Sequence, residues 1–342
     1  GLTIVLAEHR LERAVAHADR MTLLGDDGRI VADGRPREVV TRMDPEALPP
    51  LVRLGLARGW EPLPLSIAEG RRATAAERPR GAQPLPPYRE PTPPSGPPAI
   101  VASGLRVAFG GGVVLRDVDF EAHPGEMVAL MGRNGSGKTT LLRALIGLQR
   151  VEAGKIRVFG RDAAATHPAD LARDVGYVPQ NPSSILFAET LRDELAFTLR
   201  YRSHGADSDE TLARLGLADV ADRHPRDLSG GERERAALAA ILVGAPRALL
   251  LDEPTRGMDA GARRALMAML ERLRQDGVTV VMATHDVELA AAAATRIVML
   301  DDGRVIADGA PRAVLSGASA FTTQIAKLYG DGSLTLADAP AA

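Results

Sequence analysis

The chain has 342 residues, which suggests about two domains, and its 45% hydrophobic and 25% charged residues are typical of a globular protein. The formal net charge is −2 and aromatic residues make up 3% of the sequence, so it offers neither a strong positive field nor many stacking platforms for bases. We therefore expect no nucleic acid partner. The chain has no cysteine, which excludes disulfides and thiolate metal sites.

Apolar stretches are short. The longest, such as 236–244 and 248–251, fall far below the roughly 20 residues that a membrane-spanning helix needs. The chain begins at Gly1 without a charged leader followed by an apolar run, so we find no signal peptide and interpret Gly1 as a cut end.

The first residues of the chain repeat a segment near its C-terminus. Residues 1–26 align with 277–302 and residues 28–40 with 303–315, and 20 of the 39 paired positions are identical. Each copy is predicted to form an apolar strand, at 2–7 or 278–283, then a helix and two short strands about a Gly turn. Because such a piece cannot close a core alone, we interpret residues 1–44 as the C-terminal remnant of a first domain.

Residues 41–98 contain 14 of the 24 prolines. We predict a Pro-rich linker at 45–98, because proline fixes φ and removes a backbone donor. Within it, 45–59 is predicted to form a short helix that packs on the lost domain, and 78–98 is predicted to be extended and mobile.

From residue 99 strands alternate with helices, which favours an α/β domain with a largely parallel sheet. A strand at 126–131 is followed by Gly-Arg-Asn-Gly-Ser-Gly-Lys-Thr, and a helix is predicted at 140–148. This is the setting of a phosphate-binding loop, in which Lys138 reaches the β- and γ-phosphates and the Thr139 hydroxyl binds Mg²⁺. The residues predicted to hold the nucleotide here are Gly132, Arg133, Asn134, Gly135, Ser136, Gly137, Lys138, Thr139 and Thr140.

A second apolar strand, at 248–251, ends in Asp252 and Glu253. The pair suits a metal-binding Asp followed by a Glu that orients or deprotonates the attacking water. Taken alone, an Asp-Glu pair after a strand is more often a solvated strand end. Because a phosphate loop is also present, we interpret the pair as catalytic.

The sequence Leu-Ser-Gly-Gly-Glu at 228–232 precedes a helix predicted at 233–243. It resembles the signature of the ATP-binding-cassette (ABC) family, and the resemblance extends over residues 99–330, which we predict to be a complete ABC ATPase domain followed by a flexible tail at 331–342. The fold class that this implies is α/β, a P-loop NTPase of the ABC type. Its parts are a parallel core sheet with helices, an antiparallel β subdomain and a helical signature subdomain.

The same resemblance implies roles for four more residues. Phe109 stacks on adenine, Gln180 senses Mg²⁺ and the γ-phosphate, Asp259 lies in the loop at the dimer interface, and His285 contacts the γ-phosphate. Each alone has an ordinary structural explanation, and their order along the chain carries the inference. The predicted catalytic residues are therefore Glu253, His285, Gln180 and Lys138, and the predicted metal ligands are Thr139, Gln180 and Asp252. The departures, Met258 for the usual Leu and Phe109 for the commoner Tyr, do not touch the phosphates.

In the resembled family two domains pair head to tail, and Ser229, Gly230 and Gly231 of one close over the ATP of the other. The implied partner is a second ABC domain, either a missing upstream half or another copy of this chain. His9, the counterpart of His285, would serve the missing domain's own nucleotide. We therefore expect weak hydrolysis unless the chain pairs with itself.

Residues 181–195 resemble the groove in which transporter cassettes dock a transmembrane subunit. Their sequence is similar to that of energy-coupling factor (ECF) importers of vitamins or transition-metal ions. The resemblance implies an ATPase that uses ATP and Mg²⁺ at the cytoplasmic face of the cell membrane. The alternative is a soluble, translation-factor-like cassette acting on ribosomes, which predicts a long charged helical linker and a basic surface. A DNA-repair cassette would need a long coiled coil, and the sequence has no such heptad run.

Overall fold

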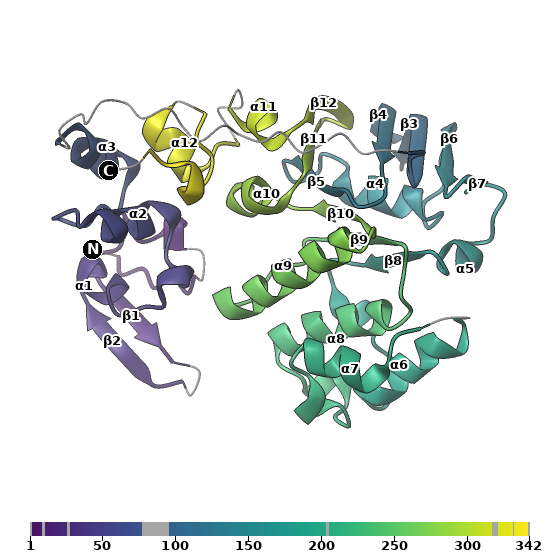
Figure 1. Ribbon diagram of the computed structural model, residues 1–342, viewed down its shortest axis with the longest axis horizontal. Coiled ribbons are helices and arrows are strands. Elements are labelled where there is room, and N and C mark those ends of the chain that lie inside the picture. Colours follow the sequence, from purple (N-terminus) through teal and green to yellow (C-terminus); the bar gives the residue numbers. More distant parts are fainter. Residues whose placement is uncertain are drawn as a thin grey trace. The chain divides into compact units, whose positions relative to one another are not determined.

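The computed structural model describes residues 2–8, 11–25, 28–76, 96–202, 205–316, 321–330 and 332–340, apart from the side chain of Arg13. The chain divides into two compact units, whose elements are labelled in Figure 1. Unit 1 comprises Gly1–Arg89, Asp259–Gly261 and Leu315–Ala342, and unit 2 comprises Glu90–Met258 and Ala262–Val314. His9 and most of the segment predicted to be extended, 78–95, lie outside the described residues.

A six-stranded sheet forms the centre of unit 2, in the order β12-β11-β5-β10-β9-β8 (Figure 1). Its strands are β5 (Met127–Gly132), β8 (Val175–Val178), β9 (Ala248–Asp252), β10 (Thr279–Ala283), β11 (Arg296–Asp301) and β12 (Arg304–Gly309). All pairs are parallel except β11 with β12. β9 and β10 are buried along their whole length, which explains their nearly continuous apolar sequences.

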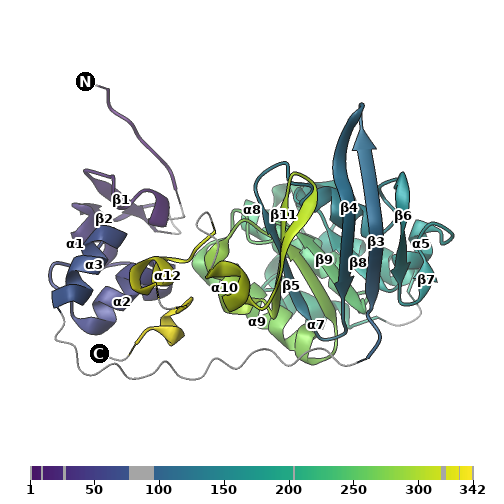
Figure 2. The same ribbon diagram turned by 90° about the horizontal axis from the view of Figure 1, so that it is seen from above.

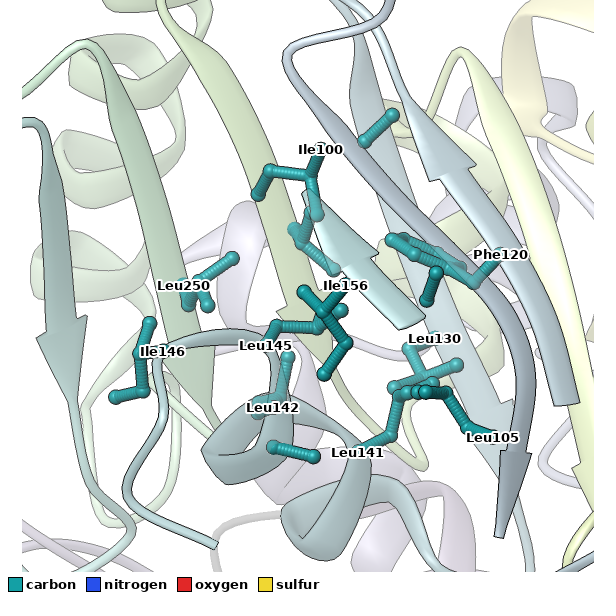
Figure 3. Packing of buried hydrophobic residues seen from close by; sticks show 14 of the residues in the cluster. Ile100, Leu105, Phe120, Leu130, Leu141, Leu142, Leu145, Ile146, Ile156 and Leu250 are labelled. Atoms are coloured by element: carbon teal, nitrogen blue, oxygen red, sulfur yellow. The ribbon is translucent and has the colours of Figure 1, made fainter. Parts of the chain in front are cut away.

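A second, antiparallel sheet in unit 2 has the order β4-β3-β6-β7. Its strands are β3 (Ile100–Phe109), β4 (Gly112–Ala122), β6 (Ala153–Val158) and β7 (Arg161–Asp162), and Figure 2 shows the first three side by side. Helix α4 (Lys138–Leu145) contributes to one buried cluster with both sheets (Figure 3). Leu105 and Phe120 from the antiparallel sheet, Leu130 and Leu250 from the parallel sheet, and Leu142 from α4 belong to it.

Helix α5 (Pro168–Leu171) precedes β8, and a helical part between β8 and β9 contains α6 (Leu191–Arg200), α7 (Ser208–Arg214) and α8 (Gly230–Leu242). The side chains of Thr190, Asp207 and Ser229 cap the first turns of α6, α7 and α8, which explains where these helices begin. Helices α9 (Ala260–Gln275), α10 (Val287–Ala293) and α11 (Pro311–Leu315) follow. Among the described residues, no helix combines the length and apolar character that crossing a bilayer requires.

Unit 1 is built from short elements from both ends of the chain. They are η1 (Leu11–Arg13), β1 (Met21–Leu24), β2 (Ile30–Gly34), α1 (Pro36–Val40), η2 (Pro45–Ala47), α2 (Pro50–Arg58), α3 (Ile67–Ala76), α12 (Gln324–Tyr329) and η6 (Leu336–Asp338). Leu51, Trp60 and Ile325 lie in one of its buried clusters. The helix predicted within 45–59 is present as α2. Residues 332–340, predicted within the flexible tail, contain η6, and the Asp338 carboxylate accepts hydrogen bonds from the N–H groups of Leu334 and Thr335.

The strand predicted at residues 2–7 is not formed. This segment has no regular structure, and its large apolar side chains are exposed, with Val5 at 92%. The prediction for 2–7 was wrong because a strand needs a hydrogen-bonded neighbour. The aligned strand β10 has one on each side, β5 and β9, whereas the described residues give 2–7 none.

The rest of the repeat is visible as two matching hairpins. β1 pairs antiparallel with β2, as β11 does with β12, and a register irregularity falls at the aligned positions 23–24 and 299–300. Arg20 pairs with Asp33, and the aligned Arg296 pairs with Asp308. The turn glycines Gly28 and Gly303 have φ of 75° and 73°. The structure therefore confirms the two predicted hairpins, which match in strand pairing, register irregularity and ion pair.

The two turn glycines provide a matched test of packing. A Cβ at Gly303 would lie 2.1 Å from the carbonyl oxygen of Val114, whereas a Cβ at Gly28 would have nothing within 4 Å. We expect Gly28→Ala to cost about 1 kcal/mol for its left-handed φ alone, and Gly303→Ala to cost about 3 kcal/mol because backbone must also move. Urea unfolding measures both, followed by far-UV circular dichroism for Gly303→Ala and by fluorescence of the single tryptophan, Trp60, for Gly28→Ala. Equal losses would contradict the packing argument.

Candidate functional site

Four neighbouring parallel strands deliver the predicted site residues to one edge of the sheet. β5 leads into the phosphate loop, β10 precedes His285, β9 ends in Asp252 with Glu253 next, and Gln180 follows β8 by two residues. Because β5, β10, β9 and β8 are adjacent and parallel, their carboxyl ends lie together (Figure 1). Residues that are more than 150 positions apart in the sequence are brought to the same place.

The phosphate loop is held closely against the sheet. Lys138 is 7% exposed, and its Nζ donates hydrogen bonds to the carbonyl oxygens of Gly132 at 2.8 Å and Arg133 at 2.9 Å. A Cβ at Gly132, where φ is 147°, would lie 2.1 Å from the carbonyl oxygen of Leu300, so only glycine fits there. Burial lowers the pKa of Lys138, while the nearby Glu253 and Asp252 carboxylates act in the opposite direction.

The loop leaves polar groups available for an anion. Helix α4 begins at Lys138, and its N-cap Gly137 supplies no side-chain hydrogen bond to the first turn. Ser136 Oγ is buried without a hydrogen-bond partner in the described part of the chain. These observations fit a nucleotide phosphate, which would accept hydrogen bonds from the exposed amides and from the orphaned hydroxyl.

A hydrogen bond joins the phosphate loop to β9. Thr139 Oγ1 donates to Asp252 Oδ2 at 2.8 Å, and Asp252 is 2% exposed. Burial raises the pKa of the Asp252 carboxyl, and the hydrogen bond from Thr139 partly counteracts this shift. No group of three or more His, Cys, Asp or Glu side chains among the described residues could hold a metal by itself. A hydroxyl beside one carboxylate instead fits Mg²⁺, which commonly takes one or two protein ligands plus substrate phosphates and water.

Glu253 and His285 meet across β9 and β10. His285 Nδ1 lies 2.7 Å from Glu253 Oε2, and the Glu253 N–H donates to the carbonyl oxygen of Ala283 at 2.9 Å. The backbone of Glu253 has φ of 54°, which is uncommon for a residue with a side chain. This arrangement turns the Glu253 carboxylate towards His285 at the end of the sheet. The Asp252, Glu253, Lys138 and Thr139 predictions thus fall at one place, with His285 in contact.

The signature residues lie at the start of another element. Ser229 is the N-cap of α8, and its side chain and that of Glu232 form a reciprocal capping box. Gly230 is exposed, and a Cβ there would meet no atom within 4 Å. No hydrogen bond of the described residues links Ser229, Gly230 or Gly231 to the phosphate loop. The structure therefore does not bring the signature into the site of its own chain.

The other predicted residues have diverse positions. Phe109 is 51% exposed where β3 turns into β4, and Gln180 is exposed after β8. Asp259 falls within unit 1, so its position relative to the phosphate loop is not described.

Sequence analysis assigned no role to two glutamates that the structure shows to be buried or to have a shifted pKa. Glu194 is 2% exposed, and its Oε2 accepts hydrogen bonds from the N–H groups of Phe187 at 2.7 Å and Ala188 at 2.8 Å. Glu234 lies on α8, and burial raises its pKa to about 7, an effect that Arg256 reduces. Glu194 lies three residues after Leu191 and directly before Leu195, and this apolar spacing around a glutamate was the available signal. Glu234 sits in a charged run that gave none.

With the parallel sheet, the phosphate loop and the Asp-Glu strand end in place, the fold and site define a P-loop NTPase of the ABC type. Residues 115–256 match the sequence model of the family described as "ABC transporter". The chain thus contains an ABC transporter ATP-binding domain, and the predicted fold class is confirmed.

Several curated relatives extend beyond this domain. The chain is 41% identical to a "Putative ABC transporter ATP-binding protein" of Streptomyces avermitilis, with 96% of this chain and 63% of the relative covered. It is 34% identical to a protein of the same description from Bacillus thuringiensis subsp. konkukian, covering 95% of this chain and 60% of the relative. The chain therefore spans less than two thirds of the length of these relatives.

Solved structures agree with the fold. One, described as the structure of the ATP-binding subunit of an ABC transporter, has a TM-score of 0.60 and 26% identity, covering 68% of this chain and 99% of the other. A second is cbiO1 of Clostridium perfringens, described as part of the ABC transporter complex cbiONQ. It has a TM-score of 0.57 and 26% identity, covering 64% of this chain and 91% of the other.

The pKa of Glu234 predicts a dependence of stability on pH. Because the folded-state pKa is raised from 4.5 to about 7, the folded protein holds a proton that the unfolded chain releases, so stability falls as pH rises through this window. We expect Glu234→Gln to increase the free energy of unfolding by about 1–2 kcal/mol at pH 8, after discounting for partial solvent exposure, and to change it little at pH 4. Urea unfolding across this pH range measures the effect.

Glu232→Gln is the matched control on the same helix. Hydrogen bonds from Ser229 lower the pKa of Glu232, so its carboxylate stabilises the fold above pH 4.5 and loses this effect as the pH falls. Glu232→Gln should therefore reduce stability at pH 8. The same sign for both variants at pH 8 would contradict the assignment.

Proposed function

We propose that this protein is an ATP-binding and ATP-hydrolysing subunit that energises a membrane transporter. The observation that carries the proposal is the junction between the phosphate loop and β9, where Thr139 contacts Asp252 and Lys138 lies close to the charges of both Asp252 and Glu253. A triphosphate with its metal satisfies the loop amides, the buried hydroxyl and the two carboxylates together.

The roles of the residues follow from their positions. Lys138 would exchange its two carbonyl partners for phosphate oxygens, and Thr139, Asp252 and Gln180 would hold Mg²⁺ directly or through water. Mg²⁺ held by these residues would neutralise charge on the phosphates. Phe109 would stack on the adenine ring. Its exposed position on the antiparallel sheet is compatible with this role.

Glu253 is the proposed acceptor for the attacking water. As the water oxygen bonds to the γ-phosphorus and the bond to the bridging oxygen breaks, the Glu253 carboxylate takes up the proton of the water. His285, whose Nδ1 lies 2.7 Å from the carboxylate, would orient it and leave its other ring nitrogen for the γ-phosphate.

The site of one chain is incomplete by itself. Gly230, in the first turn of α8, has open space beside it among the described residues, and we propose that Ser229, Gly230 and Gly231 close over the ATP of a second cassette arranged head to tail, with Asp259 at the interface. Residues 1–44 are proposed to be the end of another cassette of the same protein, in agreement with the matching hairpins and the greater length of the relatives.

Nucleotide binding and turnover test these roles separately. Glu253→Gln should keep Mg²⁺-dependent ATP affinity and lower turnover at least 100-fold, because the water loses its proton acceptor. Lys138→Ala should weaken ATP affinity at least tenfold. Calorimetry measures binding, and phosphate release measures turnover.

Lys155→Ala is the matched control, since Lys155 is an exposed lysine on β6 and should leave affinity unchanged. Turnover by Glu253→Gln at the unaltered rate would remove Glu253 as the proton acceptor. Absence of any Mg²⁺-dependent affinity in the folded chain would overturn the proposal.

A surface for the membrane subunit is proposed at residues 181–195 and the adjoining part of α6. Phe187 and Phe197 make an edge-to-face contact with ring centroids 4.8 Å apart, and Tyr201 lies 5.2 Å from Phe197. Phe187 and Tyr201 are 64% and 67% exposed. Glu194 fixes the backbone beneath Phe187, so the cluster is preorganised for a partner.

We further propose that the transporter is an ECF-type importer of a vitamin or a transition-metal ion, acting from the cytoplasmic face of the cell membrane. The likeness to cbiO1, a part of the complex cbiONQ, supports this subclass.

Membrane association tests the docking surface. Phe187→Ala should weaken co-sedimentation with inverted membrane vesicles of the source organism about tenfold, as expected for a central aromatic contact. Ile306→Ala, which truncates a comparably exposed residue on β12, should not change it. Equal binding by both variants would exclude Phe187 from the interface.

A further inference from the structure

The short segment that carries His285 is fixed through the residues on either side of it. The Thr284 N–H donates to the carbonyl oxygen of Leu130 in β5 at 3.0 Å, and Thr284 Oγ1 accepts a hydrogen bond from the Asp286 N–H at 3.0 Å. Asp286 Oδ1 accepts from the N–H of Leu289 at 3.0 Å and so caps the first turn of α10. The side chain of His285 is 40% exposed, so its backbone is positioned mainly by its two neighbours in sequence.

An arginine of another helix holds the same segment. Arg263 lies in the first turn of α9, and its Nη2 donates to Asp286 Oδ2 in an ion pair. The Asp286 side chain is 8% exposed and that of Arg263 is 33% exposed. Because a buried carboxylate is costly without a positive partner, the charge of Arg263 stabilises Asp286 in this position. The guanidinium and the helix cap therefore hold the two oxygens of one carboxylate, in the residue that directly follows His285.

The direction of the His285 ring depends on this support. His285 Nδ1 lies 2.7 Å from Glu253 Oε2, so a small rotation of the backbone around His285 would separate the two groups. Lys138 and Thr139 belong to α4, a different element, and would stay in place. Loss of Arg263 should therefore affect the hydrolytic step and leave nucleotide binding intact.

We propose that Arg263 is a positioning residue for ATP hydrolysis, which acts through Asp286 on the orientation of His285. This inference rests on the proposed roles of Glu253 and His285 in the reaction. An ion pair that only stabilised the fold would lower the free energy of unfolding without favouring one step of the reaction.

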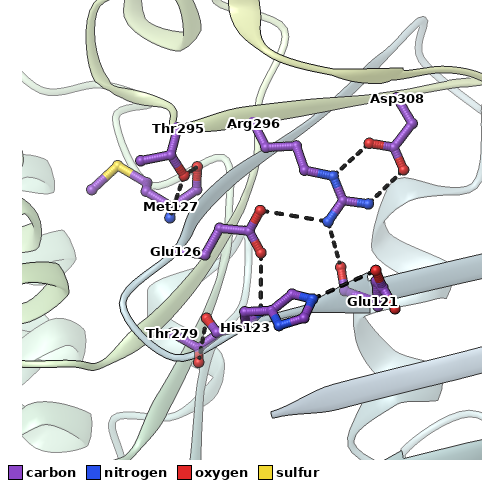
Figure 4. Close-up of polar contacts among 8 residues, drawn as sticks. All are labelled: Glu121, His123, Glu126, Met127, Thr279, Thr295, Arg296 and Asp308. Atoms are coloured by element: carbon purple, nitrogen blue, oxygen red, sulfur yellow. Dashed lines mark hydrogen bonds and ion pairs between the residues drawn. The ribbon is translucent and has the colours of Figure 1, made fainter. Parts of the chain in front are cut away.

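A second arginine–aspartate pair in unit 2 provides the control. Arg296 pairs with Asp308, and the Arg296 side chain is 19% exposed (Figure 4). Its Nη1 also donates to the Glu121 carbonyl oxygen at 3.1 Å and lies 3.5 Å from Glu126 Oε1. Glu126 directly precedes β5, whereas the phosphate loop follows β5, so this pair lies at the opposite end of the strand. Its loss should lower stability without changing the environment of His285.

Histidine side-chain NMR of the full 342-residue chain tests the positioning without any turnover. The ring resonances of His285 are assigned by their loss in His285→Ala. We expect Arg263→Ala to shift these resonances, because the ring leaves the Glu253 carboxylate, and Arg296→Ala to leave them unchanged. Arg263→Lys should shift them less than Arg263→Ala, since an ammonium can replace the contact that Nη2 makes with Asp286.

ATP turnover provides the second readout. Arg263→Ala should lower kcat about fivefold and leave the ATP affinity measured by calorimetry unchanged. In a chain that already carries His285→Ala, the further change Arg263→Ala should cause no additional loss of kcat, because its route to the reaction is absent. Arg263→Lys should restore most of the turnover.

Unchanged His285 resonances in Arg263→Ala, or an equal shift in Arg296→Ala, would overturn the inference. Additive losses of kcat in the two backgrounds would also overturn it, because they indicate a general effect on the fold. If Glu253→Gln abolished turnover and Arg263→Ala left it unaltered, the proposed function would stand and this inference alone would fail. Absence of turnover in the unaltered chain would count against the proposed function, and the resonances would still decide the role of Arg263.

Discussion

The candidate site depends on placing charged groups at the end of a sheet that is buried on both faces. Lys138 and Asp252 are both buried, and burial shifts their pKa values in opposite directions, each disfavouring its charged form. Other contacts act against these shifts, since the Thr139 hydroxyl and the Lys138 charge favour the Asp252 carboxylate, and the Asp252 and Glu253 charges favour the Lys138 ammonium. Loss of one partner would leave an uncompensated buried charge, which ties the loop geometry to the strand geometry.

The same constraint accounts for the unusual backbone at Glu253. A residue with φ of 54° is held in place by the hydrogen bond from its N–H to Ala283 and by the contact of its carboxylate with His285. Both partners belong to β10 or to the residues that follow it, so the parallel pairing of β9 with β10 maintains the strain. A conformation of this kind at the end of two buried strands gives the carboxylate a fixed direction before any ligand arrives.

Sequence reasoning succeeded where structure is encoded locally. The phosphate loop was recognised because its strand, β5, and its helix, α4, directly flank it in the sequence. It failed where contacts between segments that are far apart in the sequence determine the structure. The apolar pattern of 2–7 predicts a strand, yet a strand depends on neighbours that no local pattern reveals. Leu51 and Ile325 lie in one buried cluster although they are far apart in the sequence. The role of Glu194 follows only from the structure, in which its carboxylate accepts a hydrogen bond from the N–H of Phe187.

Glycine is present for different reasons in the phosphate loop, at Gly132, and in the signature segment, at Gly230. At Gly132 the carbonyl of Leu300 leaves no room for a side chain, so the fold of this chain alone requires glycine. At Gly230 the described residues leave open space, although glycine loses more conformational freedom on folding than any other residue. Packing within the described part of the chain does not require a glycine at this position. A ligand surface that approaches the first turn of α8 from outside would explain the residue, and the proposed pairing with a second cassette would supply one.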